Sequence, residues 1–176
     1  MLTMVECTSI PDGYDSLFDQ SLPHMEAGTF DWGIVGNPVT YEAKKAAVRE
    51  QFESFINGPI TKVTYWEKDG HPIEMAAGVM HPHDFGYISW EFVIYGADAS
   101  GSKSWMHDVA YLEITRDYIR DDLGLLGHKA SCVEGGSVHA FQLNRTGAEG
   151  IYTVETESTK QTEFGVSIAT LKFTYL

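Results

Sequence analysis

The spacing of apolar side chains along the chain predicts four helices. In the clearest case Val48, Phe52 and Phe55 fall on one helical face, and charged residues occupy most of the rest. The dipeptide Asn37-Pro38 is expected to open this helix, because asparagine is a favoured N-cap and proline suits the first helical turn. The predicted helices, in chain order, cover residues 14–25, 41–55, 105–123 and 138–145.

Other segments alternate apolar and polar residues with a period of two, or are rich in β-branched and aromatic residues, which predicts strands. The predicted strands, the first of them at a sheet edge, cover residues 3–8, 63–66, 73–80, 87–95, 128–133, 151–157 and 165–175. With no internal repeat and no long linker, this order predicts a single domain over residues 1–176. We expect an α+β fold with a mixed, mostly antiparallel central sheet of six or seven strands, flanked by about four helices.

Glycines mark the ends of several of these elements. Asp69-Gly70 predicts a tight two-residue turn that joins the two arms of a hairpin. Gly124 is expected to cap the C-terminus of the helix over 105–123. Local chemistry of this kind therefore predicts where the chain reverses, before any packing is considered.

Composition and charge limit the classes of partner that the protein can bind. The chain has 12 basic and 25 acidic residues and a net charge of -13, so its surface repels nucleic acid and attracts cations. A hydrophobic fraction of 43% rules out a disordered chain. No apolar run is long enough to cross a membrane, and the N-terminus lacks the features of a signal peptide. With two distant cysteines, the expectation is a cytoplasmic protein with no membrane partner.

The most informative segment is the small, polar loop 96–104 between the strand 87–95 and the helix 105–123. Backbone N–H groups at such a junction can bind phosphate, provided that small residues let the anion approach. A solvated loop with a serine N-cap is the alternative. The residues expected to bind the phosphates of a cofactor are Ser100, Gly101, Ser102, Lys103 and Ser104.

The element order and this loop resemble the GNAT superfamily of CoA-dependent N-acyltransferases, whose pyrophosphate loop has the pattern Gln/Arg-x-x-Gly-x-Gly/Ala. The stretch 98–103 keeps the central glycine at Gly101 but has Asp98 and Lys103 at the two outer positions. Because a carboxylate repels a diphosphate, we expect the Asp98 side chain to point away, or the CoA site to be altered. Lys103 could instead meet the 3′-phosphate of CoA by its charge.

A second match lies near the C-terminus, where the family often shows Asn-x-x-Ala-x-x-Leu-Tyr followed by Gly-Phe. Ala140, Leu143 and Gly147 agree with this pattern, whereas Asn144 replaces the tyrosine that commonly protonates the leaving thiolate. The resemblance implies transfer of an acetyl or other acyl group from acetyl-CoA, or another acyl-CoA, to a small-molecule or peptide amine. The acidic surface favours a cationic amine. A homodimer is left open.

Acyl transfer to an amine needs a proton acceptor and a donor for the developing oxyanion. Glu91 is the candidate base, because it is the lone carboxylate in an apolar strand and partial burial would raise its pKa. The alternative is a solvent-facing carboxylate, or one paired with Lys62 or Lys68. Tyr152 is the second catalytic candidate, and Ser137 is a further possible donor.

A metal enzyme is the main rival among catalytic functions. His81 and His83, with Asp84 or Glu91, offer nitrogen and oxygen ligands, although the spacing is longer than in cupin-type sites. We therefore predict no metal site.

Two further alternatives involve no acyl transfer. Cys132 and His139 could form a nucleophile and its base, but a buried, inert thiol is the better interpretation. A catalytically degenerate GNAT-like domain, or another α+β binding or assembly module, is favoured by Asp98 and Asn144 at positions where the family has other residues.

Overall fold

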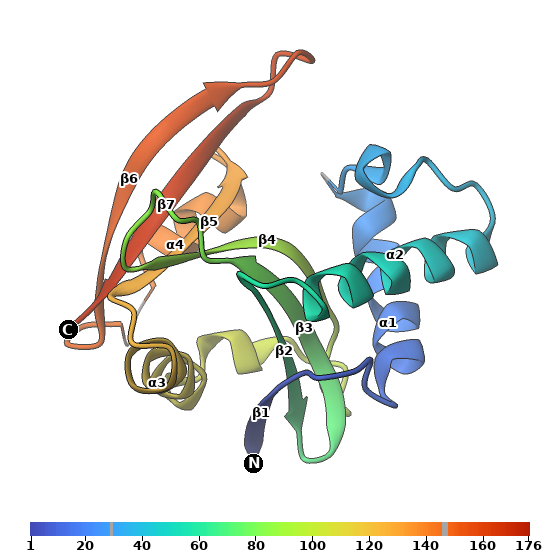
Figure 1. Ribbon diagram of the computed structural model, residues 1–176, viewed down its shortest axis with the longest axis horizontal. Coiled ribbons are helices and arrows are strands. Elements are labelled where there is room, and N and C mark those ends of the chain that lie inside the picture. The colour runs from blue at the N-terminus through green and yellow to red at the C-terminus, as the bar shows by residue number, and fades with distance from the viewer. Residues whose placement is uncertain (29, 146–147) are drawn as a thin grey trace. The chain divides into compact units, whose positions relative to one another are not determined.

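The computed structural model describes residues 1–28, 30–145 and 148–176. Within these residues, seven strands form one sheet in the order β1-β2-β3-β4-β5-β7-β6 (Figure 1). The strands are β1 (Leu2–Glu6), β2 (Thr61–Lys68), β3 (His71–Val79), β4 (Tyr87–Tyr95), β5 (Gly127–Val133), β6 (Tyr152–Gln161) and β7 (Ser167–Tyr175). β4 pairs with β5 in parallel, whereas the β1–β2, β5–β7 and β6–β7 pairs are antiparallel. The predicted α+β fold with a mixed sheet is confirmed.

Four α-helices accompany this sheet within the described residues. They are α1 (Tyr14–Ala27), α2 (Tyr41–Ile56), α3 (Val109–Asp117) and α4 (Ser137–Leu143). Shorter helical turns are η1 (Trp32–Val35), η2 (Ser104–His107) and the π-helical turn η3 (Tyr118–Asp122). No helix in the described part of the chain is long and apolar enough to cross a membrane.

The chain divides into two compact units. Unit 1 comprises Met1–Gly78 and Phe92–Lys103, and unit 2 comprises Val79–Glu91 and Ser104–Leu176. The boundary cuts through β4, whose first half belongs to unit 2 and whose second half belongs to unit 1. A single domain over 1–176 stays a prediction.

The core of unit 1 is built from the apolar faces of α1 and α2 and from the strands. Leu17 and Phe18 of α1 and Phe52 of α2 are fully buried. The Phe52 ring meets the ring of Phe92 in β4 edge-on, at a centroid distance of 4.9 Å. Burial of side chains of this size stabilises the fold by about 1.5–3 kcal/mol each, so this contact fixes the second half of β4.

The start of α2 corrects one prediction. Thr40 caps the helix, and its hydroxyl accepts the N–H of Ala43 at 3.2 Å. Asn37 instead follows η1 with a φ of 53°, and its N–H donates to the carbonyl of Trp32 at 2.9 Å. Asparagine tolerates this left-handed backbone better than most residues. Asn37 therefore forms a turn here and does not act as the helix cap that the sequence predicted.

Unit 2 is held together by β5, β7 and β6, of which β6 and β7 form a long hairpin (Figure 1). Its buried side chains include Ile88, Ile119 and Leu171. β5 pairs with β7 along its whole length, from Gly127↔Thr174 to Val133↔Ile168. β6 runs to Gln161, beyond its predicted end, with an irregularity between Thr156 and Ser158.

The helix predicted over 105–123 is divided into three pieces. Asp108 has an extended backbone, with φ −70° and ψ 127°, and separates η2 from α3. Trp105 is fully buried, so its place in the apolar pattern reflects core packing in η2 and not a continuous helix. Gly124 follows η3 with a φ of 68°, and the N–H of Leu125 donates to Ile119 at 2.9 Å, which confirms the predicted C-terminal glycine.

Candidate functional site

The parallel pair β4–β5 defines the centre of the sheet. Its register runs from Tyr87↔Gly127 to Trp90↔Ala130, whereas β4 itself continues to Tyr95. The second half of β4 leads directly into the loop that the sequence singled out. The geometry of that loop therefore decides whether a phosphate could bind after β4.

The carboxylate of Asp98 organises the loop. Its Oδ1 accepts the N–H of Ser100 at 3.0 Å, the hydroxyl of Ser100 at 2.5 Å and the N–H of Ser102 at 3.0 Å. Its Oδ2 lies 3.3 Å from the Lys68 ammonium. These contacts, led by the Ser100 hydroxyl, lower the pKa of Asp98 to about 2. The side chain therefore points into its own loop, which excludes the first of the two outcomes expected from the sequence.

The backbone of the loop closes on the same residue. The N–H of Gly101 donates to the carbonyl of Asp98 at 2.9 Å, and the N–H of Asp98 donates to the carbonyl of Ser102 at 2.8 Å. Gly101 has a φ of 81°, a conformation that most side chains would strain. Three of the backbone N–H groups expected to meet a phosphate therefore already donate to Asp98. The cofactor-binding role of 100–104 stays a prediction.

Lys103 is directed toward α1. Its ammonium lies 3.2 Å from Nδ1 of His24 and 5.2 Å from the centre of the Tyr95 ring. Burial lowers the pKa of Lys103, and burial together with the Lys103 charge lowers the pKa of His24. The sequence did not predict that Lys103 contacts His24 and the ring of Tyr95.

Glu91 lies in unit 2, close to His81. The side chain of Glu91 is 47% exposed, and its Oε1 lies 3.6 Å from Nε2 of His81. Of the placements that the sequence left open, the solvent-facing one describes Glu91 better, because nearly half of its side chain is exposed. The alternative partners are engaged elsewhere, since Lys62 pairs with Glu6 and Lys68 pairs with Asp98. The role of Glu91 as a base stays a prediction.

Tyr152 is buried at the start of β6, and its hydroxyl has no hydrogen-bond partner within the described structure. Burial raises its pKa, and the nearby charge of Arg145 opposes the shift. Arg145 lies over the ring of Phe141 at 4.8 Å and over the ring of Tyr111 at 5.7 Å. No sequence signal marked Arg145, because one arginine after a short helix is usually a surface residue.

A histidine that the sequence did not single out lies near this tyrosine in unit 2. The His128 ring stacks on Phe173 at a centroid distance of 4.4 Å, and its Nδ1 lies 3.0 Å from the hydroxyl of Tyr175. Burial, assisted by the positive charge of Arg145, lowers the pKa of His128 to about 3. His128 is therefore a neutral, half-buried and hydrogen-bonded residue of unit 2 at physiological pH.

The chain is similar to known proteins in structure but not in sequence. No protein-family model and no curated protein matches the sequence. Vibrio cholerae spermidine N-acetyltransferase in complex with CoA and spermine superposes with a TM-score of 0.65 at 10% identity, covering 99% of this chain and 95% of that one. A GNAT-family acetyltransferase from Desulfovibrio desulfuricans superposes with a TM-score of 0.58 at 11% identity, covering 99% of both chains. The chain has the GNAT fold. The resemblance inferred from the sequence is thus confirmed at the level of the fold.

The stretch that resembles the C-terminal motif begins in α4 and has Asn144 where that motif has a tyrosine. Asn144 ends α4, is exposed, and its side-chain amide donates to the carbonyl of Ala140 at 2.9 Å. Gly147, which agrees with the GNAT pattern, lies outside the described residues. The motif therefore presents no acidic hydroxyl at Asn144.

The rival sites find little support. Burial raises the pKa of the Cys132 thiol, which suits an inert cysteine, and Nδ1 of His139 accepts the N–H of Gly135 at 2.9 Å. Across residues 1–28, 30–145 and 148–176, no group of three His, Cys, Asp or Glu side chains is placed to hold a metal ion. The described residues thus offer no ligand set for the metal alternative at His81 and His83.

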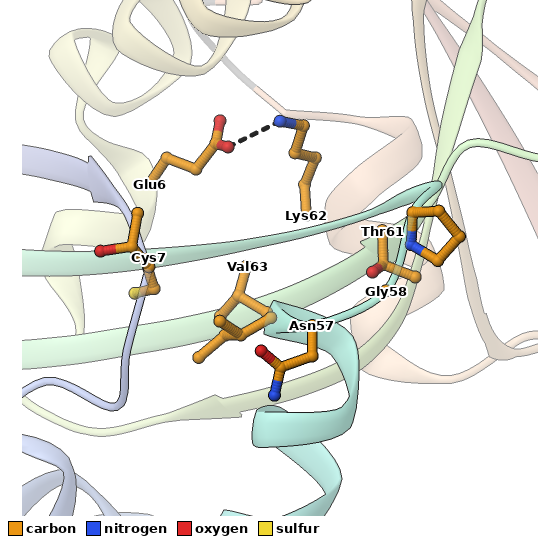
Figure 2. A pocket seen from close by; sticks show the side chains of 10 residues that line it. Glu6, Cys7, Asn57, Gly58, Thr61, Lys62 and Val63 are labelled. Atoms are coloured by element: carbon orange, nitrogen blue, oxygen red, sulfur yellow. Dashed lines mark hydrogen bonds and ion pairs between the residues drawn. The ribbon is translucent and has the colours of Figure 1, made fainter.

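A cavity of about 250 Å³ opens in unit 1, where the C-terminal end of α2 meets β1 and β2 (Figure 2). Its lining includes the Glu6–Lys62 ion pair at 2.6 Å, together with Cys7 and Asn57. Burial, with a contribution from Glu6, raises the pKa of Cys7 to about 11, so its thiol is protonated at neutral pH. The cavity is thus polar but holds no reactive thiolate.

Proposed function

We propose that the chain is an N-acyltransferase that moves an acyl group from a CoA thioester to a small cationic amine. The observation that carries the proposal is the GNAT fold, which superposes over 99% of the chain on solved N-acetyltransferases. One of those proteins holds both CoA and spermine. A donor thioester and a polyamine are accordingly the substrate classes to test on this chain.

The loop after β4 is the proposed binding site for the diphosphate of CoA. The N–H groups of Ser100 and Ser102 and the ammonium of Lys68 already converge on one carboxylate, so they are arranged to hold an oxyanion. Gly101 lets the backbone take the required turn. Lys103 and Ser104 complete the proposed segment, and a further phosphate would bind Lys103 in exchange for its contact with His24.

Glu91 is the proposed proton acceptor. Attack of the neutral amine on the thioester carbonyl forms the new C–N bond, and the amine loses a proton to Glu91 through water. His81, 3.6 Å away, is placed to bind the same water or to orient the carboxylate. The net charge of -13 supports a cationic acceptor, because it concentrates cations near the surface.

Tyr152 is the proposed proton donor. As the C–S bond breaks, the CoA thiolate takes a proton from the Tyr152 hydroxyl, which is then restored from solvent. The raised pKa of Tyr152 keeps this hydroxyl protonated at neutral pH. Because Asn144 has no acidic hydroxyl, a donor from another element is required.

A binding or assembly module without catalysis is the second candidate. Two observations favour it: Asp98 engages the loop donors, and Asn144 is bonded to its own helix. Such a module would need neither a base nor a proton donor. It would therefore be insensitive to changes at Glu91 and Tyr152.

A thermal-shift experiment with CoA and acetyl-CoA tests the proposal, followed by thiol release with spermine and with a peptide amine. Ligand at 100 times its dissociation constant should stabilise the fold by about 2.7 kcal/mol. Stabilisation with amine-dependent thiol release is the expected result. Stabilisation without thiol release from any amine would favour the binding module, and no shift at millimolar CoA or acetyl-CoA would overturn the proposed acyl transfer.

A further inference from the structure

Four donors from two separate segments of unit 1 converge on the carboxylate of Asp98. Three come from the loop itself: the N–H and hydroxyl of Ser100 and the N–H of Ser102. The fourth is the ammonium of Lys68, which arrives from the end of β2. The Asp98 side chain is only 9% exposed, so these donors surround it closely.

These donors form a binding site for an oxyanion, and the carboxylate of Asp98 fills it. Backbone N–H groups with one lysine are the donors that a phosphate oxygen would need. A tethered carboxylate acts at a high effective concentration, on the order of millimolar or more, against any ligand from solution. Two anions cannot share the donors, because their charges repel at this distance.

We propose that Asp98 is an internal competitor that occupies the diphosphate position of this loop and thereby sets the affinity of the chain for CoA. The proposal rests on the proposed function, since it concerns the same loop. When CoA binds, the Asp98 side chain turns out, and Lys68 exchanges the carboxylate for a phosphate oxygen. Asp98 is thus an affinity-determining residue, and it does not take part in the chemistry.

The competitor role of Asp98 also predicts how replacement of Lys68 changes the affinity for CoA. In the wild-type chain, loss of Lys68 weakens both the internal carboxylate contact and the contact with phosphate, so the two effects on CoA binding partly cancel. Once Asp98 is replaced, only the contact with phosphate remains to be lost. Lys68→Met should therefore reduce CoA affinity more in the Asp98→Ala background than in the wild type.

Isothermal titration with CoA and with inorganic pyrophosphate tests the proposal on wild type, Asp98→Ala and Asp98→Asn. We expect Asp98→Ala to bind both ligands at least tenfold more tightly than wild type. Asp98→Asn should gain less, because its amide oxygen still accepts the backbone N–H groups but carries no charge. Asp12→Ala is the matched control, since it removes an exposed carboxylate from the same unit and should leave both affinities unchanged.

Circular dichroism and thermal unfolding establish that each variant is folded. CoA affinity in a folded Asp98→Ala that is equal to or weaker than wild type would overturn the competitor role, while CoA binding by the wild type would leave the proposed function intact. A gain for CoA without a gain for pyrophosphate would also overturn it, because the effect would then lie outside the loop. Absence of CoA binding in every variant would instead overturn the proposed function.

Discussion

Lys103 donates to His24. The ammonium lies 3.2 Å from Nδ1 of the imidazole, and both groups lie against the ring of Tyr95, which His24 stacks on at an interplanar angle of 11°. A protonated lysine has no acceptor capacity, so Nδ1 of His24 must be unprotonated for this contact to form. The relationship links α1 to the loop that follows β4, and it makes the charge of His24 depend on Lys103.

Lys103→Met should raise the pKa of His24 toward its ordinary value of 6.5, because the substitution removes a neighbouring positive charge. In the wild type the folded-state pKa lies below the unfolded one, so the stability that neutral His24 contributes is present above pH 6.5 and is lost as the pH falls through the folded pKa. NMR titration of the His24 ring measures the shift. Lys45→Met, which removes a lysine from α2, should leave the His24 titration unchanged.

His128 should make the fold sensitive to acid. Its pKa is lowered to about 3 in the folded state, so folding is favoured above pH 6.5 and this contribution is lost progressively as the pH falls from 6.5 toward 3. Between pH 6.5 and 5 the loss from this residue should be roughly 2 kcal/mol. Urea unfolding across this range measures it, and His128→Phe should flatten the pH dependence. An unchanged slope in the variant would contradict the assignment.

Glu91→Gln should lower kcat of the acyl transfer about 100-fold, within the range expected for loss of a general base, with little change in CoA affinity. Steady-state kinetics with acetyl-CoA and spermine, read as thiol release, measures the effect. The matched control is Glu50→Gln, which removes an exposed carboxylate from α2. Equal turnover in Glu91→Gln and wild type would rule Glu91 out as the base.

Tyr152→Phe separates catalysis from packing. The Tyr152 hydroxyl is buried without a hydrogen-bond partner in the described structure, so its removal should leave the unfolding temperature unchanged or raise it. A proton donor, however, is lost, and kcat should fall about tenfold or more. Thermal unfolding and thiol release measure the two effects. A stable variant with wild-type kcat would assign Tyr152 a structural role only.

Local chemistry predicted the fold well where a few neighbouring residues decide the backbone. Asp69-Gly70 forms the hairpin turn with φ values of 54° and 76°, as the two-residue spacing required. Asn37 shows the limit of such signals, because one residue type suits both a helix cap and a left-handed turn. Trp105 shows a second limit. Its apolar spacing predicted a continuous helix, but a residue that is buried in the core just before a helix has the same spacing.

The candidate site was harder to predict, because its geometry depends on contacts between distant segments. Lys68 and Asp98 lie on separate elements, and only the folded chain brings them to 3.3 Å. The sequence indicated that Asp98 was unusual at its position, but it could not show that the carboxylate binds the loop's own amides. The apolar strand around Glu91 left both partial burial and a solvent-facing position open, and only the folded chain shows that 47% of the side chain is exposed.

Titration of the ¹⁵N-labelled chain with CoA, followed by amide NMR, tests most directly whether the loop after β4 holds the diphosphate. If the loop holds the diphosphate, saturable shifts should be largest at the amides of residues 100–104, accompanied by a change at Lys68. Asp98→Ala should reach saturation at lower CoA concentration than wild type. Saturable CoA binding that leaves these amides unshifted, or no binding at millimolar CoA, would show that the loop does not hold the diphosphate of CoA.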